Sequence, residues 1–339
     1  MSDEIFEEYS KEKEPAKYYK SYAWKTAIGL QQVDGLEPSE YLIKTAEQNI
    51  NGDISFDDAH ALISSYYKTS KTKADRTEEA DKVSVRIAQI ISENSFVFSP
   101  VELMTIHKRL FEGIYSHAGR IRDYNITKDE WVLDGDTVTY GNAFNLRETL
   151  EYDFGVEKNF TYNGLSTEQI ISHIARFISN LWQIHIFGEG NTRTTAVFLI
   201  KYLGKLGFNV TNDIFAENSW YFRNALVRAN YNNRAKGVFE TTKYLELFLR
   251  NLLLGEDNVL SNREMHVNYK EVKSSTEETV TRERLIVEIL EKQPKITLQE
   301  IADKIGKSLR TVKTSIKALQ ESGKIERVGG KKEGSWKVL

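Results

Sequence analysis

One stretch of the sequence, from Thr192 to about Leu206, constrains the fold more than any other. Apolar residues fall on nearly every side of a helix built from it, so that helix must be deeply buried. Segment 166–184 carries an apolar stripe at helical spacing and opens with Ser166 and Gln169, which predicts a second helix. Only 4 prolines occur in 339 residues, which lets helices dominate. The chain is therefore predicted to be mainly α-helical.

Segment 126–140 breaks this helical pattern. It places β-forming residues on both sides of Asp134-Gly135, a pair that is a strong signal for a hairpin turn. We therefore expect one β-hairpin inside an otherwise helical domain.

The charge is distributed unequally along the chain. The last segment, 281–339, has a net charge of +6, whereas the other residues together have −9, so the overall charge of −3 conceals a basic tail. The stretch before it is polar and predicts a linker. The expected boundaries are 1–80 for an N-terminal helical region, 81–260 for a central domain, 261–280 for the linker and 281–339 for the basic tail domain.

Composition excludes several classes of site and location. The sequence has no cysteine, which rules out disulfides, thiolate catalysis and cysteine-ligated zinc. Its 6 histidines include no pair four residues apart, so a histidine-pair metal site on one helix is excluded as well. The N-terminus is acidic and does not resemble a signal peptide, and no apolar run approaches the length of a membrane span. The expected location is the cytoplasm, without a membrane partner.

A helix end, a glycine loop and a new helix follow one another at 184–196. Gly188 and Gly190 allow the backbone to approach a ligand closely. At the start of the new helix, the backbone N–H groups of Gly190, Asn191 and Thr192 lack intrahelical acceptors, and the helix dipole favours an anion there. Arg193 lies in the first turn and can add a charge-assisted hydrogen bond. The loop therefore predicts an anion site.

Two further side chains of this loop suggest the chemistry. Glu189 would repel an anion unless a cation lies between them, and Mg²⁺ bound by one carboxylate and phosphate oxygens meets that condition. His185 is the side chain suited to accepting a proton near neutral pH. The combination predicts phosphoryl or nucleotidyl transfer. The structural alternative is a histidine that only caps or packs a helix end, beside a loop that only turns the chain.

Segment 185–196, His-Ile-Phe-Gly-Glu-Gly-Asn-Thr-Arg-Thr-Thr-Ala, resembles the signature of the Fic family, His-x-Phe-x-[Asp/Glu]-Gly-Asn-x-Arg-x-x-Arg. Segment 119–126 resembles the part of that family that leads into its flap hairpin, and the resemblance spans about 85–255. It implies a Fic-type helical core with one β-hairpin flap. It also implies an enzyme that transfers AMP from ATP to a Ser, Thr or Tyr hydroxyl of a protein.

The resemblance also implies roles for individual residues. His185 would deprotonate the target hydroxyl, and Glu189 would hold Mg²⁺ between the α- and β-phosphates of ATP. The protein substrate would dock on the hairpin at 126–140 as an added strand. The nucleotide-binding residues that it implies are Gly188, Gly190, Asn191, Thr192, Arg193 and Asn230, with Arg193 on the β-phosphate and Asn230 in the nucleoside pocket. For Asn230, the alternative is an ordinary cap at a helix end.

Two departures from the family pattern concern the triphosphate and its regulation. Ala196 replaces the final arginine of the signature, which in the family holds the γ-phosphate and pairs with an inhibitory glutamate. Segment 24–38 resembles the family's inhibitory helix, but Leu30 replaces its hydroxyl residue and Asp34 its glutamate. Because aspartate is shorter, we expect a regulatory helix that still packs on the core and inhibits weakly or by bulk alone. The alternative is a helix that simply ends at Asp34-Gly35.

The basic tail resembles a winged helix-turn-helix, a small α+β domain. Helices are predicted at 282–292, from the capping box Thr297–Glu300 onward, and at about 309–321, followed by two short strands around a Gly-Gly turn. Duplex DNA is the expected ligand. The residues expected to contact it are Arg310, Lys313, Thr314 and Lys317 on the third helix and Lys331 and Lys332 at the tip of the wing. Protein docking or dimer contacts are the alternative.

Together these patterns predict a Fic-type protein adenylyltransferase that uses ATP and Mg²⁺, with an N-terminal regulatory segment and a DNA-binding tail. One alternative is a DNA-binding transcriptional regulator whose Fic core binds nucleotide but catalyses little. Another is a Fic enzyme that uses a different donor or removes AMP. The target protein, the DNA sequence and the oligomeric state are left open.

Overall fold

The computed structural model describes residues 15–69, 75–269, 273–328 and 334–339. It divides the chain into two compact units, one that ends at Tyr269 and one that begins at Lys270. The N-terminal region and the catalytic domain expected from the sequence lie together in the first unit, and their four-part division stays a prediction. In the described part of the chain, no helix combines the length and apolar character that a membrane crossing requires.

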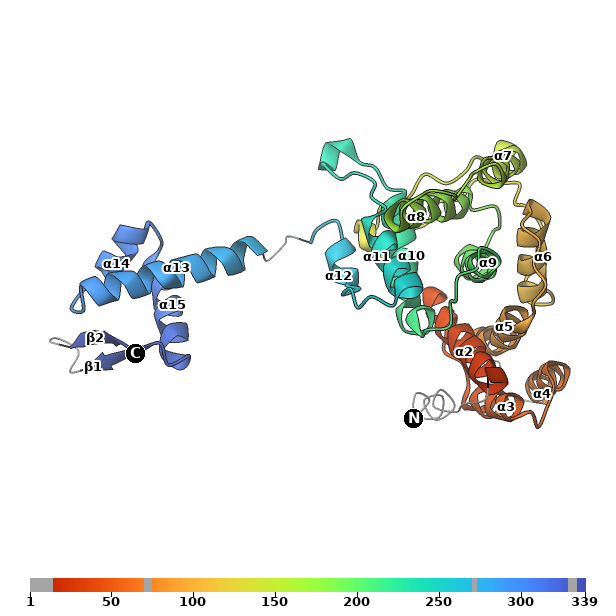
Figure 1. The fold of residues 1–339 in the computed structure, drawn as a ribbon, viewed down its shortest axis with the longest axis horizontal. Coiled ribbons are helices and arrows are strands. Elements are labelled where there is room, and N and C mark those ends of the chain that lie inside the picture. Colours follow the sequence, from red (N-terminus) through yellow and green to blue (C-terminus); the bar gives the residue numbers. More distant parts are fainter. Residues whose placement is uncertain (1–14, 70–74, 270–272, 329–333) are drawn as a thin grey trace. The chain divides into compact units, whose positions relative to one another are not determined.

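The first unit is built from α-helices joined by loops and short 3₁₀ turns (Figure 1). Its α-helices are α2 (Pro15–Gly29), α3 (Glu40–Asn51), α4 (Phe56–Thr69), α5 (Asp75–Ser92), α6 (Pro100–Phe111), α7 (Leu146–Lys158), α8 (Thr167–Ile184), α9 (Asn191–Lys205), α10 (Ile214–Ala229), α11 (Lys243–Leu254) and α12 (Asn262–Met265). Its 3₁₀ turns are η1 (Leu30–Asp34), η2 (Trp131–Leu133), η3 (Ala143–Asn145) and η4 (Arg234–Lys236).

Helix α9 is the centre of the first unit, as its all-round apolar sequence predicts. Figure 1 shows it end-on with other helices around it, and α5, α6 and α8 pack against it. Every residue of α9 from Asn191 to Ile200 is buried. Helix α8 begins at the predicted capping box, in which Ser166 and Gln169 bond each other's backbone N–H groups. The mainly helical fold is thus confirmed.

The segment 126–140, which we call the flap, differs from its prediction. The chain reverses at Asp134 and Gly135, as expected, but the arms form no strand ladder. Val132 and Leu133 are fully buried because the tip folds inward as the 3₁₀ turn η2. In the arm of the flap that follows the turn, the carbonyl of Thr139 accepts a hydrogen bond from the side-chain amide of Gln183, at the end of α8. The expected β-hairpin is therefore an extended loop with a 3₁₀ tip.

Contacts on several sides hold the flap to the rest of the first unit. The buried carboxylate of Glu130 pairs with Arg223 of α10 at 2.6 Å and accepts a hydrogen bond from the Tyr140 hydroxyl. At the tip, the backbone N–H of Val267 donates to the carbonyl of Val132 at 2.9 Å. This last bond joins the flap to the stretch that follows α12, close to the end of the first unit.

The N-terminal helix α2 packs on α5 and α10, which confirms the expectation that this helix docks on the core. Gly29 makes the close approach possible, because a Cβ atom there would lie 2.2 Å from the carbonyl oxygen of Ala216. The hydroxyl of Ser219 donates to the carbonyl of Gly29 at 2.7 Å. As a result η1, which follows directly, is positioned against α9 and α10.

The second unit has its own core and an α+β arrangement. It contains α13 (Lys273–Lys292), α14 (Leu298–Ile305), α15 (Leu309–Glu321), β1 (Ile325–Val328) and β2 (Ser335–Val338). The strands pair antiparallel, with Ile325 opposite Val338. Thr297 and Glu300 form the predicted capping box at the start of α14. The Gly-Gly turn expected between the strands lies outside the described residues.

Candidate functional site

The signature loop between α8 and α9 is closed by one asparagine side chain. The amide of Asn191 donates to the carbonyl of Phe187 at 2.8 Å, and its oxygen accepts from the Phe187 N–H at 3.1 Å. Phe187 is buried, and its ring stacks on His107 with centroids 3.7 Å apart. The side chain of Asn191 and the ring of His107 therefore hold the loop in place at Phe187.

His185 ends α8 in the left-handed conformation, with φ of 51°. Its Nδ1 lies 3.3 Å from the carbonyl oxygen of Trp182, which can only accept, so Nδ1 carries the proton. The other ring nitrogen, Nε2, is then a bare lone pair, and it is buried without a hydrogen-bond partner. Burial lowers the pKa of His185 well below its usual range, and the charge of Lys128 adds to this effect. The imidazole is therefore neutral near pH 7.

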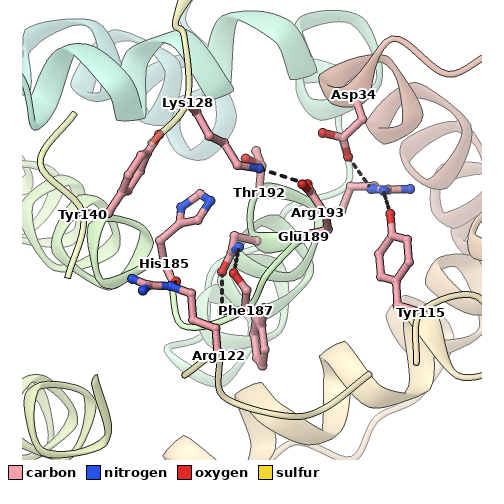
Figure 2. Close-up of polar contacts among 12 residues, drawn as sticks. Asp34, Tyr115, Arg122, Lys128, Tyr140, His185, Phe187, Glu189, Thr192 and Arg193 are labelled. Atoms are coloured by element: carbon pink, nitrogen blue, oxygen red, sulfur yellow. Dashed lines mark hydrogen bonds and ion pairs between the residues drawn. The ribbon is translucent and has the colours of Figure 1, made fainter. Parts of the chain in front are cut away.

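The ring of His185 is covered in this structure. It is 3 % exposed, and the ring of Tyr140 from the flap packs on it with centroids 4.4 Å apart (Figure 2). Nε2 is therefore shielded from solvent in this conformation.

The start of α9 has the uncapped helix end on which the prediction of an anion site rests. Gly190 is its N-cap with φ of 75°, and no side chain caps this helix end. A Cβ on Gly190 would lie 2.4 Å from the ring of Phe111, and one on Gly188 would lie 2.6 Å from the hydroxyl of Tyr124. His107 of α6 also contacts the loop, since its Nε2 lies 3.0 Å from the carbonyl oxygen of Glu189. Glycine is therefore needed at both positions because the loop backbone packs against Phe111 and Tyr124, while the uncapped N–H groups at the start of α9 are the feature that suits an anion.

Arg193, expected to bind a phosphate, is paired with a carboxylate of the N-terminal region. Its guanidinium is 1 % exposed, and Nε lies 2.8 Å from Oδ2 of Asp34 (Figure 2). The contact lacks the alignment of a hydrogen bond, so it acts through charge. Asp34, expected to be a weak regulatory residue, pairs with Arg193 and not with a group at position 196, and its effect on activity stays a prediction.

Helix α5 supplies a second carboxylate to the same guanidinium. Oε1 of Glu79 lies 2.6 Å from Nη2 of Arg193, and it also accepts a hydrogen bond from the hydroxyl of Tyr115. Gln31 of η1 accepts from Nη1 at 3.0 Å. Two negative charges therefore surround one positive charge, and the guanidinium of Arg193 is fully engaged within the chain.

Glu189, expected to hold the metal, is paired with the flap. Its half-exposed carboxylate lies 2.9 Å from Nζ of Lys128, which reaches toward the loop from the arm of the flap that precedes the turn (Figure 2). Among the residues that the structure describes, there is no group of three or more His, Cys, Asp or Glu side chains that could hold a metal ion by itself. A single carboxylate with phosphate oxygens remains a donor set that Mg²⁺ uses.

Three other predicted or altered positions have structural contacts. Thr192 accepts a hydrogen bond from the indole N–H of Trp182 at 3.0 Å. Asn230 ends α10, and its buried amide donates to the carbonyl of Leu226 in the same helix and to that of Ser179 on α8. The first is the contact expected of a helix cap, and a place for Asn230 in a nucleoside pocket stays a prediction. Ala196 is fully buried, so no charge reaches the site from that position.

Sequence reasoning did not assign Glu79, Lys128 or Tyr140 to this site. Nothing near Glu79 or Lys128 in the sequence marks them, because each meets its partner only through the tertiary fold. Arg122 is different, since it lies in the segment that resembles the approach to the flap. Its Nε donates to the carbonyl of His185 at 2.7 Å, and it also bonds the carbonyl of Gly141. It therefore positions the end of α8 against the flap.

The predicted DNA-contacting residues lie on one face of α15 where the structure describes them. Val312 and Leu319 point into the core of the second unit. All four residues predicted on this helix are exposed, namely Arg310, Lys313, Thr314 and Lys317. Lys331 and Lys332, predicted at the tip of the wing, lie outside the described residues.

A family match covers the segment that contains this loop. Residues 97–203, which include α6, α8, the flap and most of α9, match the Fic/DOC family. The chain therefore contains a Fic/DOC domain, built around the loop described above.

The second unit is identified in the same way. Residues 281–326 match the winged helix-turn-helix DNA-binding family, so this Fic/DOC domain is followed by a winged helix. Among solved structures, a Fic family protein from Desulfovibrio desulfuricans G20 matches with a TM-score of 0.47 and 12 % sequence identity. The match covers 100 % of this chain and 93 % of that protein.

Proposed function

We propose that the first unit is a Fic-type protein adenylyltransferase, which moves AMP from ATP to a Ser, Thr or Tyr hydroxyl of a protein substrate. One observation carries the proposal: a bare imidazole nitrogen on His185 adjoins an uncapped helix N-terminus at Gly190. The first is a proton acceptor and the second is an anion cradle. The Fic/DOC match at 97–203 supports nucleotide-based chemistry at this loop.

The residues present suit a nucleotide with a bound cation. The backbone at Gly190, Asn191 and Thr192 would lie against phosphate oxygens, and the carboxylate of Glu189 would hold Mg²⁺. When bound, Mg²⁺ would neutralise negative charge on the phosphates. Both Glu189 and Arg193 are paired within the chain here, so binding requires them to exchange partners.

His185 would perform the proton transfer. Its Nε2 takes the proton from the target hydroxyl while that oxygen bonds to the α-phosphorus of ATP, and the bond from the α-phosphorus to the bridging oxygen breaks to release pyrophosphate. The bond between Nδ1 and Trp182 keeps the required tautomer, and the low pKa keeps the ring neutral before the step. A protein substrate that binds along the flap would displace Tyr140 from the ring.

Labelled ATP tests this proposal. The full chain is incubated with candidate protein substrates and with ATP labelled on either the α- or the γ-phosphate. Label from the α-phosphate on protein, lost in His185→Ala and kept in the matched control His60→Ala, is the expected result. Label from the γ-phosphate would instead indicate phosphate transfer and would refute AMP transfer.

A second candidate is a DNA-binding regulator whose Fic core binds nucleotide and catalyses little. Buried Ala196 and the fully engaged guanidinium of Arg193 favour it, because both reduce the charge available to a triphosphate. Nucleotide binding without label transfer, together with a gel shift of duplex DNA that weakens steeply with salt, would support this function over the first.

A further inference from the structure

The candidate nucleotide site has an unusual balance of charge. A triphosphate needs several cationic groups, yet Arg193 is enclosed by the carboxylates of Asp34 and Glu79. Ala196, where the signature of the family has a second arginine, is an uncharged and fully buried residue. The loop by itself therefore offers backbone N–H groups and little free positive charge.

The flap carries a cation to the same place. Nζ of Lys128 lies 2.9 Å from the carboxylate of Glu189, the residue directly before Gly190. The side chain of Lys128 is 27 % exposed, and that of Glu189 is 56 % exposed, so solvent or a ligand can reach both. An ammonium group has three donors, and one of them is used by Glu189. Lys128 can therefore bind a second anion at the start of α9.

The other arginines near the loop have structural partners. The guanidinium of Arg122 donates to the backbone carbonyls of His185 and Gly141, which fix the end of α8. Arg223 forms an ion pair with the buried carboxylate of Glu130. Moving either of them to a ligand would leave buried acceptors or a buried charge unpaired, whereas moving Lys128 leaves only an exposed carboxylate that a cation can take over.

We propose that Lys128 is a phosphate-binding residue. When a divalent cation binds the carboxylate of Glu189, the ammonium group of Lys128 moves from that carboxylate to the phosphate oxygens of the nucleotide. This inference rests on the proposed nucleotide site. Lys128 then supplies the positive charge that Ala196 cannot supply. Because Lys128 lies in the flap, the binding of nucleotide and the position of the flap are linked. In the uncomplexed chain the same lysine neutralises Glu189.

Equilibrium binding of fluorescent adenosine, ADP and ATP, with Mg²⁺, tests the proposal in the full chain. Lys128→Met removes the charge and keeps the apolar stem, Lys128→Arg keeps the charge, and Lys108→Met removes another lysine that pairs with a glutamate, on the surface of α6. All proteins are measured with native Asp34 and with Asp34→Asn, so that engagement of Arg193 does not hide binding.

Lys128→Met is expected to weaken ADP and ATP binding about tenfold or more and to leave adenosine binding unchanged, since it removes one charge-assisted hydrogen bond to phosphate. Lys128→Arg and Lys108→Met are expected to bind all three ligands as the parent does. Equal or tighter ATP binding by Lys128→Met would overturn the inference, and so would an equal loss of adenosine, which indicates a structural effect. If neither parent binds any nucleotide, the proposed function fails together with the inference.

Discussion

Asp34→Asn tests whether the N-terminal region withholds Arg193 from anions. Removing one partner of a fully buried ion pair costs about 3–5 kcal/mol. The side chain of Asp34 is 32 % exposed, its contact is not aligned as a hydrogen bond, and Glu79 remains on the same guanidinium. These features reduce the contribution of Asp34 to about 1–2 kcal/mol.

The same free energy opposes any ligand that must take Arg193 from Asp34. Asp34→Asn is therefore expected to raise the affinity for ATP about tenfold, because 1.4 kcal/mol corresponds to a factor of ten. The loss of the ion pair is expected to lower the melting temperature of the first unit by about 3–6 °C. Binding is measured with a fluorescent ATP analogue at fixed salt, and melting by calorimetry on the same preparations.

Asp213→Asn is the matched control. Asp213 pairs with Lys25 of α2 at 2.9 Å, so this substitution loosens the docking of α2 without touching Arg193. If both variants raise ATP affinity equally, the effect comes from a looser N-terminal helix. If Asp34→Asn melts at a lower temperature but binds ATP no better, Arg193 is not a ligand for phosphate and the reasoning is refuted.

Further predictions concern stability, the loop and the tail. The pKa of His107 is lowered by burial to about 4, below the 6.5 of an exposed histidine, so the unfolded chain binds the extra proton between these values. His107 is therefore expected to lower stability in urea by up to about 3 kcal/mol as pH drops from 6.5 to 4, and His107→Gln should remove this part of the slope while the part from buried His185 remains. Gly190→Ala is expected to destabilise the fold by about 2 kcal/mol or more, given its positive φ and the Phe111 ring, whereas Gly155→Ala in open space on α7 should be neutral or stabilising by calorimetry. Lys313→Ala is expected to weaken DNA binding in gel shifts and to reduce its salt dependence by about one phosphate contact.

Local patterns predicted the parts of this molecule that depend on nearby residues. The all-round apolar sequence of α9 predicted its burial, and capping residues predicted where α8 and α14 begin. The loop from His185 to Arg193 was predicted as a unit because its glycines, carboxylate and imidazole are close in sequence. The outer face of α15 followed from the same helical spacing.

Long-range pairings could not be predicted in the same way. Glu79 and Lys128 lie on other elements, and only the packed fold brings them to Arg193 and Glu189. The flap was predicted as a β-hairpin because β-forming residues flank Asp134-Gly135, but burial of Val132 at the tip prevails over that pattern. The partner of Asp34 could not be predicted from the length of its side chain either, since it depends on where η1 is docked.

The hydrogen bond from Val267 to the carbonyl of Val132 has a practical consequence for dissecting the protein. A truncation that ends at residue 260 looks harmless by sequence, yet it deletes the donor that secures the tip of the flap, together with the edge contact between His266 and Trp131. A fragment of this kind would hold the flap, and with it Tyr140, less firmly over the ring of His185 than the intact chain does. Measurements of ligand binding or activity therefore belong with fragments that retain Tyr269.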